Sequence, residues 1–215
     1  DPARVPASIE QVGEQMRGRD YVAGVLFHGP FWQMREWLGF EGLCMRFLED
    51  PEMIRDMVSF WTAYTCALLE KVMPHVDLDF LHISEDMAYK QKAMISPDMA
   101  REFLQPCYLV WNDIRRSHGC PVYDMDSDGC IGELIPVWIE SGINVCDPVE
   151  VAAGNDIAVL RERFGRKVAF RGGVDKRAMA KGGETLRREM ERIAPVARDG
   201  SATAPHDIHA GDYWN

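Results

Sequence analysis

Short apolar runs alternate with helical patterns along this chain of 215 residues, and no other sequence feature limits the fold as strongly. The runs are typical of buried strands, and the amphipathic stretches between them are typical of helices. Strands that alternate with helices predict parallel strands joined by right-handed crossovers, which is an α/β fold. No linker or repeat divides the chain, so we expect one domain over 1–215. The predicted strands cover 21–27, 78–83, 121–126, 143–147, 167–172 and 201–205.

Capping and breaking residues mark the ends of the helices. Asp50 followed by Pro51 predicts a helix start, because proline at the first helical position loses no hydrogen bond. Ser96 and Pro97 repeat this signal, and Gly119 ends the second helix. The predicted helices cover 51–75, 97–118, 131–141, 155–164 and 183–198.

The alternation fits either a doubly wound sheet or a closed barrel. A dinucleotide-binding sheet carries G-x-G-x-x-G after its first strand, and this sequence has no such motif. The absence of this motif therefore favours the barrel.

Charge and hydropathy narrow the classes of partner. With 34 acidic and 24 basic residues the formal net charge is −10, which opposes binding to nucleic acid or to an anionic membrane. We therefore expect a small-molecule substrate or a protein partner. No apolar run has the roughly 18 residues that span a bilayer, and the first residues lack signal-peptide features, so we expect a cytoplasmic protein. The six cysteines form no CxxC motif and are expected to be reduced thiols.

Polar residues follow the predicted strands, and ligands of α/β proteins meet the carboxyl ends of strands. We expect catalytic roles for the acidic residues that follow the second and third strands. Substrate contacts are expected from residues that follow the other strands. The catalytic candidates are Glu85, Asp86, Asp126 and Asp128, and the substrate-binding candidates are His28, Trp32, Glu150, Arg171 and Asp175.

Asp126 and Asp128 lie two residues apart, so in an extended segment they share one face. They could hold a cation or act as a paired acid and base. The alternative is that Asp128 and Gly129 form a turn while Asp126 caps a helix. For Glu85 and Asp86 the alternative is again capping, although clustered carboxylates raise each other's pKa, as a proton donor requires.

Histidine and glycine positions also leave alternatives open. His206 is close to a second histidine and an aspartate, so it could bind a metal or transfer a proton. His82 lies in an apolar strand, where a satisfied core histidine is expected. Arg171 precedes two glycines and could bind an anionic group, but the same segment also fits a tight turn with Asp175 capping a short helix. Trp32 could line a pocket or pack in the core.

Four stretches resemble one branch of the uroporphyrinogen-decarboxylase-like superfamily. They are HISEDMAYKQKAMISPDMAREFLQP (82–106), YDMDSDGCIGELIPVWIESGINVCDPVEVAAG (123–154), VAFRGGVDKRAMAKG (168–182) and APHDIHAGDYW (204–214). This superfamily groups tetrapyrrole decarboxylases with corrinoid-dependent and cobalamin-independent methyltransferases. The resemblance covers the chain from Leu81 to Asn215.

The resemblance implies a (β/α)8 TIM barrel with its site at the carboxyl face. The six predicted strands would be the third to eighth of that barrel, with the first two strands and the last helix missing. An incomplete barrel leaves edges and apolar faces uncovered, so we expect a homo-oligomer or further protein to cover them.

The sequence departs from the family at its metal site. The zinc methyltransferases have a His-x-Cys-Gly segment and a later cysteine, where this chain has Asp126-Ser127-Asp128-Gly129 and His206. The resemblance therefore implies Asp126, Asp128 and His206 as ligands of a divalent metal such as zinc, held more weakly than by thiolates, or no metal at all. The arginine-rich segment with which the decarboxylases bind uroporphyrinogen does not occur here, which disfavours that substrate.

Three functions follow from the resemblance and the acidic residues. The leading hypothesis is a methyltransferase that passes a methyl group from a small O- or N-methylated compound to a corrinoid protein. The second is a cofactor-independent decarboxylase of a tetrapyrrole or another carboxylate. The third is a barrel that binds a small molecule without catalysis.

Overall fold

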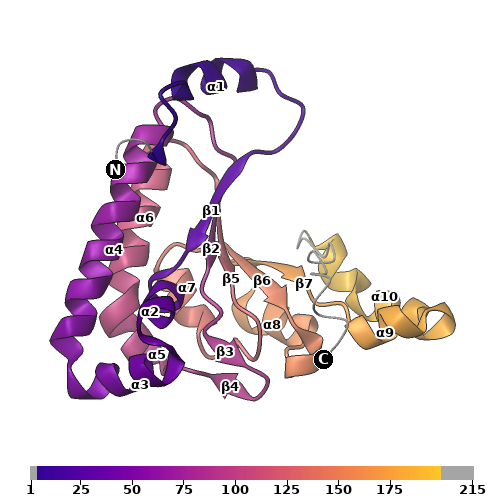
Figure 1. Ribbon diagram of the computed structural model, residues 1–215. Coiled ribbons are helices and arrows are strands. Elements are labelled where there is room, and N and C mark those ends of the chain that lie inside the picture. Colours follow the sequence, from indigo (N-terminus) through magenta and orange to yellow (C-terminus); the bar gives the residue numbers. More distant parts are fainter. Residues whose placement is uncertain (1–3, 200–215) are drawn as a thin grey trace.

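The computed structural model describes residues 4–199 (Figure 1). Helices and strands alternate, as the sequence predicts, and the α/β fold is confirmed. The elements are α1 (Ile9–Met16), β1 (Gly24–His28), α2 (Pro30–Leu38), α3 (Phe40–Glu49), α4 (Pro51–Val72), β2 (Phe80–Ser84), β3 (Ala88–Tyr89), β4 (Lys92–Ala93), α5 (Pro97–Met99), η2 (Ala100–Leu104), α6 (Gln105–Ser117), β5 (Val122–Asp126), α7 (Ile135–Glu140), β6 (Val145–Val149), η3 (Val151–Ala153), α8 (Ile157–Phe164), β7 (Ala169–Gly172), α9 (Lys176–Lys181) and α10 (Gly183–Arg198).

Helices begin where the capping residues predict. The Asp50 side chain accepts a hydrogen bond from the Met53 N–H at the start of α4, and the Ser96 hydroxyl does the same for Met99. From Pro97 to Ser117, α5, the π-helical η2 and α6 follow one another without a break, in agreement with one long predicted helix.

Several boundaries were predicted wrongly. The predicted helix 131–141 begins only at Ile135, because Pro136 in the first turn favours a start there and residues 132–134 form turns. The predicted helix 155–164 begins at Ile157, after Asp156 as its cap. The helix predicted to reach position 75 ends at Val72. Helices α1, α2 and α3 and the β3–β4 hairpin were not predicted.

The main sheet contains five parallel strands in the order β1-β2-β5-β6-β7. Each strand therefore lies beside the strand that precedes it in this sheet along the chain. A doubly wound sheet has a point where the strand order reverses, and the described strands have none. This topology is consistent with part of a TIM-like fold, while closure into a barrel stays a prediction. The sixth predicted strand, 201–205, lies outside the described residues.

The two faces of the sheet differ in polarity. One face presents Leu81, Ile83, Tyr123 and Met125, which are fully buried in the core together with residues of α4, α6, α7 and α8. Figure 1 shows α4 and α6 side by side along this part of the molecule. We call the opposite face the inner face. Residues of this face are His28 and Leu26 on β1, His82 and Ser84 on β2, Asp124 and Asp126 on β5, and Arg171 on β7.

A polar inner face distinguishes this sheet from a sheet that is covered on both sides. Strands covered on both sides are apolar throughout, whereas β2 and β5 alternate apolar and polar residues. Leu26 on the inner face remains 64% exposed. The inner face is therefore available for a site.

Two further expectations concern cysteines and membranes. All six cysteines lie within the described part and are free thiols, in agreement with the expectation of no disulfide. Among the described helices, none has the length and apolar character that crossing a membrane requires.

Candidate functional site

A chain of polar contacts crosses the inner face from β2 to β5. The Nδ1 atom of His82 lies 2.8 Å from Oδ2 of Asp124. Its Nε2 atom lies 3.8 Å from Oδ2 of Asp126, which also accepts a 2.6 Å hydrogen bond from the Ser84 hydroxyl. These contacts follow from the register, because His82 pairs with Asp124 and Ser84 with Asp126. The imidazole is thereby held between two carboxylates.

Arg171 continues the chain of contacts to β6 and β7. Its guanidinium lies 3.2 Å from Oδ2 of Asp124 and also pairs with Asp147. The two carboxylates are almost completely buried, whereas the Arg171 side chain is 35% exposed. Arg171 therefore pairs with both buried anions, and its side chain is partly exposed to solvent.

The carboxylates also set the protonation of the imidazole. Burial alone would lower the pKa of His82, but hydrogen bonding to Asp124 and Asp126 and their negative charges raise it to about 9. His82 is therefore a cation near neutral pH.

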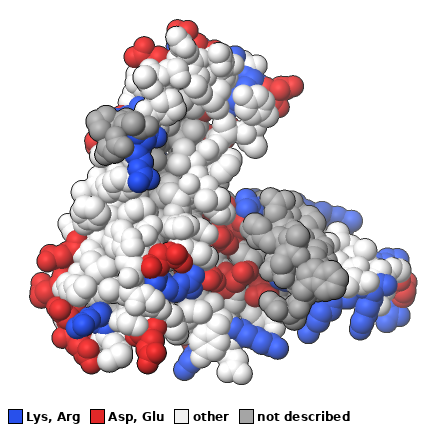
Figure 2. Space-filling model, viewed as in Figure 1, with Lys and Arg blue, Asp and Glu red and all other residues white. Residues whose placement is uncertain are grey.

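Four carboxylates, which we call the acidic rim, lie at the carboxyl ends of the strands: Asp86, Asp126, Asp128 and Glu150. Although the Asp128 side chain reaches solvent, partial removal from water raises its pKa, and the charges of the other three raise it further, to about 6. Figure 2 shows acidic side chains near the centre of this view. The rim is therefore suited to a cation or to a shared proton.

Glu85 lies away from the rim and is fully buried. Its carboxylate accepts a 2.9 Å hydrogen bond from the Trp32 N–H in the first turn of α2 and another from the Tyr108 hydroxyl. Burial raises the pKa of Glu85 to about 7, against the opposing effect of these hydrogen bonds. Through the contact with Trp32, Glu85 caps α2, a helix that is distant from it in sequence. Capping was the alternative interpretation of Glu85, but the capped helix is not the one that follows it.

The close approach of Gly29 to Glu85 gives a first prediction. A Cβ atom at Gly29 would lie 2.1 Å from Cδ of Glu85, although the backbone there suits any residue. We expect Gly29→Ala to lower the free energy of unfolding by about 1–3 kcal/mol through this overlap. Denaturation with urea measures the change. Gly132→Ala is the control, because an added Cβ meets nothing within 4 Å there; equal losses in both variants would contradict the explanation.

Asp86 points in a different direction from its neighbour. Its backbone has a φ of 43°, a left-handed conformation that is rare for residues other than glycine. Arg35 holds it by donating to its carbonyl and to its carboxylate, each at 3.0 Å. The Cζ atom of the same guanidinium lies 4.3 Å from the centre of the Trp32 ring. The centre of the His28 ring lies 5.2 Å from the centre of the Trp32 ring. The predicted residues His28, Trp32 and Asp86 thus belong to one continuous cluster.

Glu150 and Asp175 also have partners of their own. Glu150 accepts from the Gly129 N–H at 3.1 Å and lies 3.7 Å from the amine of Lys176. Asp175 caps α9 by accepting from the Arg177 N–H, which is the alternative that the sequence analysis left open. His206 lies outside the described residues.

Sequence reasoning assigned no function to His82, Asp124 and Asp147, which together lie at the centre of the inner face. His82 does satisfy its hydrogen bonds, as expected, but it does so on the polar face and not in the apolar core. The signal that could have found His82 and Asp124 is the two-residue alternation of polar and apolar side chains in 80–84 and 122–126.

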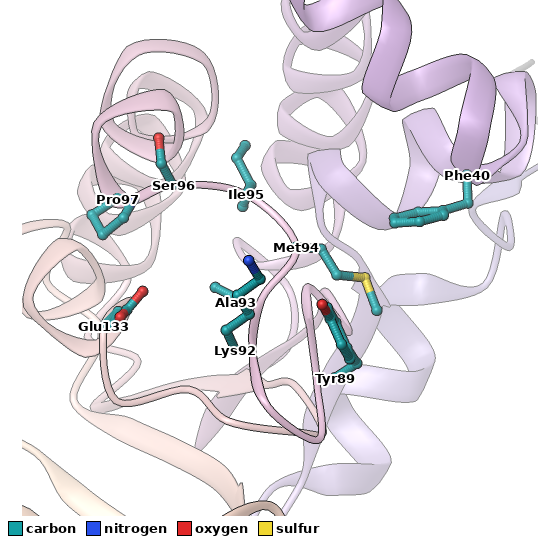
Figure 3. A pocket seen from close by; sticks show the side chains of 9 residues that line it. All are labelled: Phe40, Tyr89, Lys92, Ala93, Met94, Ile95, Ser96, Pro97 and Glu133. Carbon is teal, nitrogen blue, oxygen red and sulfur yellow. The ribbon is translucent and has the colours of Figure 1, made fainter.

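A separate cavity of about 640 Å³ lies beside the β3–β4 hairpin and contains none of the predicted site residues. Figure 3 shows its aromatic and methionine side chains on one side and Ser96, Pro97 and Glu133 on the other. None of the four residues of the acidic rim lines this cavity. The lining consists of Phe40, Tyr89, Lys92, Ala93, Met94, Ile95, Ser96, Pro97 and Glu133.

Comparison with known proteins supports the fold. Neither a scan against protein-family models nor a search of the curated proteins gave a match. Among solved structures, the chain is similar to a methyltransferase from Methanosarcina mazei, with a TM-score of 0.68 and 16% identity. The similarity covers 92% of this chain and 56% of that chain, so this sequence spans little more than half the length of its neighbour. At this identity the similarity shows the fold, and function has to be argued from the site.

Proposed function

We propose that this chain is part of a methyltransferase of the uroporphyrinogen-decarboxylase-like superfamily. In this proposal it passes a methyl group from a small O- or N-methylated compound to a corrinoid protein. The observation that supports it most is the acidic rim beside His28 and Trp32, and the similarity in fold to a methyltransferase over 92% of the chain agrees with it. The sequence stretches that resemble the superfamily support it independently.

The polar residues of the sheet suit the chemistry of this reaction. A methyl group leaves oxygen or nitrogen readily only when that atom takes up a proton or contacts a cation. In the proposal, Asp126 and Asp128 of the acidic rim bind the leaving group through such a proton or cation. The neighbouring aromatic residues His28 and Trp32 form the wall against which the substrate packs.

Other predicted groups have supporting places in the proposal. Glu150 and Arg171 complete the polar boundary of the site, and Asp86 links it to the aromatic wall through Arg35. Asp126 and Asp128 remain candidates for holding a divalent metal such as zinc, together with His206. Their oxygen atoms suit harder ions than thiolates do. The decarboxylase hypothesis gains nothing from the structural neighbour.

A panel of methylated compounds tests the proposal. We expect the protein, mixed with reduced corrinoid, to release a demethylated product from at least one methoxyaromatic or methylamine compound, as detected by mass spectrometry. Asp126→Asn should slow this reaction by about 10²–10⁴-fold, because the leaving atom loses its charged partner.

The control is Glu140→Gln, an exposed residue of α7 that pairs with Arg101 away from the inner face. This variant should keep the wild-type rate. Absence of any demethylated product with wild-type protein would overturn the proposal. An unchanged rate in Asp126→Asn would remove Asp126 from the site.

A further inference from the structure

Three side chains from three neighbouring strands converge beneath the acidic rim: His82 on β2, Asp124 on β5 and Asp147 on β6. We call them the buried triad. A nitrogen or oxygen atom from each lies within 4.8 Å of one from each of the others. At most 6% of any of these residues is exposed. The spacing is within reach of a single small cation.

The hydrogen bonds of Asp124 leave part of its carboxylate unused. Oδ2 contacts both His82 and Arg171, whereas Oδ1 is buried and has no hydrogen-bond partner among the described residues. A buried carboxylate oxygen without a partner is costly unless it binds a cation or a donor. This atom is therefore an observation in favour of a ligand at the triad, independent of the spacing.

Arg171 shows that the triad attracts a cation. Its guanidinium pairs with Asp124 and Asp147 together, and it is the most exposed member of this group. A long side chain that is partly solvated can rotate outward at modest cost. A metal ion could then take over the charge compensation that Arg171 provides.

We propose that His82, Asp124 and Asp147 form a binding site for one divalent first-row transition ion, with Arg171 as the competing cation. Binding displaces the proton of His82, because only a neutral imidazole has a free nitrogen lone pair. One imidazole nitrogen and two carboxylate oxygens then suit Zn²⁺ or Mn²⁺ better than Mg²⁺ or Ca²⁺, which favour oxygen alone. This set shares no residue with Asp126, Asp128 and His206. The inference does not depend on methyl transfer, since binding is measured without substrate.

Calorimetric titration of chelator-treated protein with Zn²⁺, and spin-resonance titration with Mn²⁺, test the site. We expect one ion per wild-type chain and at least tenfold tighter binding by Arg171→Met, because the competing guanidinium is gone. Asp147→Asn and His82→Gln should each lose this binding. Circular dichroism of every variant shows whether it is folded.

The control variants are Asp128→Asn and His206→Gln, which remove the ligands that the family resemblance implies and should leave this ion bound. The proposal is overturned if these two variants lose the ion while Asp147→Asn keeps it, because the ion then binds at the rim. It is also overturned if Arg171→Met binds no more tightly than wild type. Unfolding would expose free cysteines that bind Zn²⁺, so the gain of affinity is read from Mn²⁺, an ion for which thiolates are poor ligands, and only with Arg171→Met protein that circular dichroism shows to be folded.

Discussion

Replacing Arg171 by methionine is expected to lower the free energy of unfolding by about 3 kcal/mol in metal-free buffer. The change leaves the carboxylates of Asp124 and Asp147 buried without the guanidinium that now pairs with both. We take the low end of the range for broken buried ion pairs, because Arg171 is itself partly exposed. Urea denaturation of both proteins at neutral pH measures the loss.

A second substitution tests the electrostatic cause. If the loss comes from two uncompensated anions, Asp147→Asn in the Arg171→Met background should restore at least about 1 kcal/mol by removing one of them. In the wild-type background the same change should be destabilising, because Arg171 loses a partner. Additive effects of the two substitutions would show that packing of the arginine stem, and not charge, dominates.

The sheet was predictable from local sequence because its signal is local. A buried strand needs only a short apolar run, and crossovers between parallel strands leave helical patterns of sufficient length. The predicted runs 78–83 and 121–126 therefore became β2 and β5, shifted by one or two residues at most. The order of the strands then follows the order of the chain.

Helix α2 was missed because its start is stabilised from a distance. Pro30 is a suitable first residue, but Gly29 before it offers no capping side chain. The cap comes from Glu85, which is 53 residues away from Trp32. A pattern that is read over neighbouring residues cannot contain that contact.

The position of the acidic rim was predictable because the carboxyl ends of parallel strands lie at the same edge of a sheet. Asp126, Asp128, Asp86 and Glu150 were expected at one edge of the sheet, and the charges of the other three do raise the pKa of Asp128. Sequence could not separate Asp86 from Glu85, since adjacent residues after a strand diverge according to backbone angles. Only the fold sends one carboxylate to the rim and the other beneath α2.

Glu85→Gln is expected to reverse the order of stability between mutant and wild type as the pH rises. The pKa of Glu85 rises from 4.5 to about 7 on folding, mainly through burial, so the folded state binds its proton more tightly than the unfolded state. The protonated form therefore stabilises the fold fully below pH 4.5, and this contribution is lost as the pH passes 7. Glutamine keeps the neutral form at every pH. Its oxygen can accept from Trp32, and its amide can donate to Tyr108.

The free energy of unfolding of wild type, minus that of Glu85→Gln, should therefore fall by on the order of 3 kcal/mol between pH 4.5 and pH 8. Taking this difference cancels the raised pKa values of His82 and Asp128, which both proteins share. Glu140→Gln, at an exposed carboxylate whose pKa is lowered by Arg101, is the control and should show no such fall. A difference that is constant with pH would mean that Glu85 is ionised throughout this range. The cap on α2 would then be a buried carboxylate anion, and the substitution would change the stability by the same amount across this pH range.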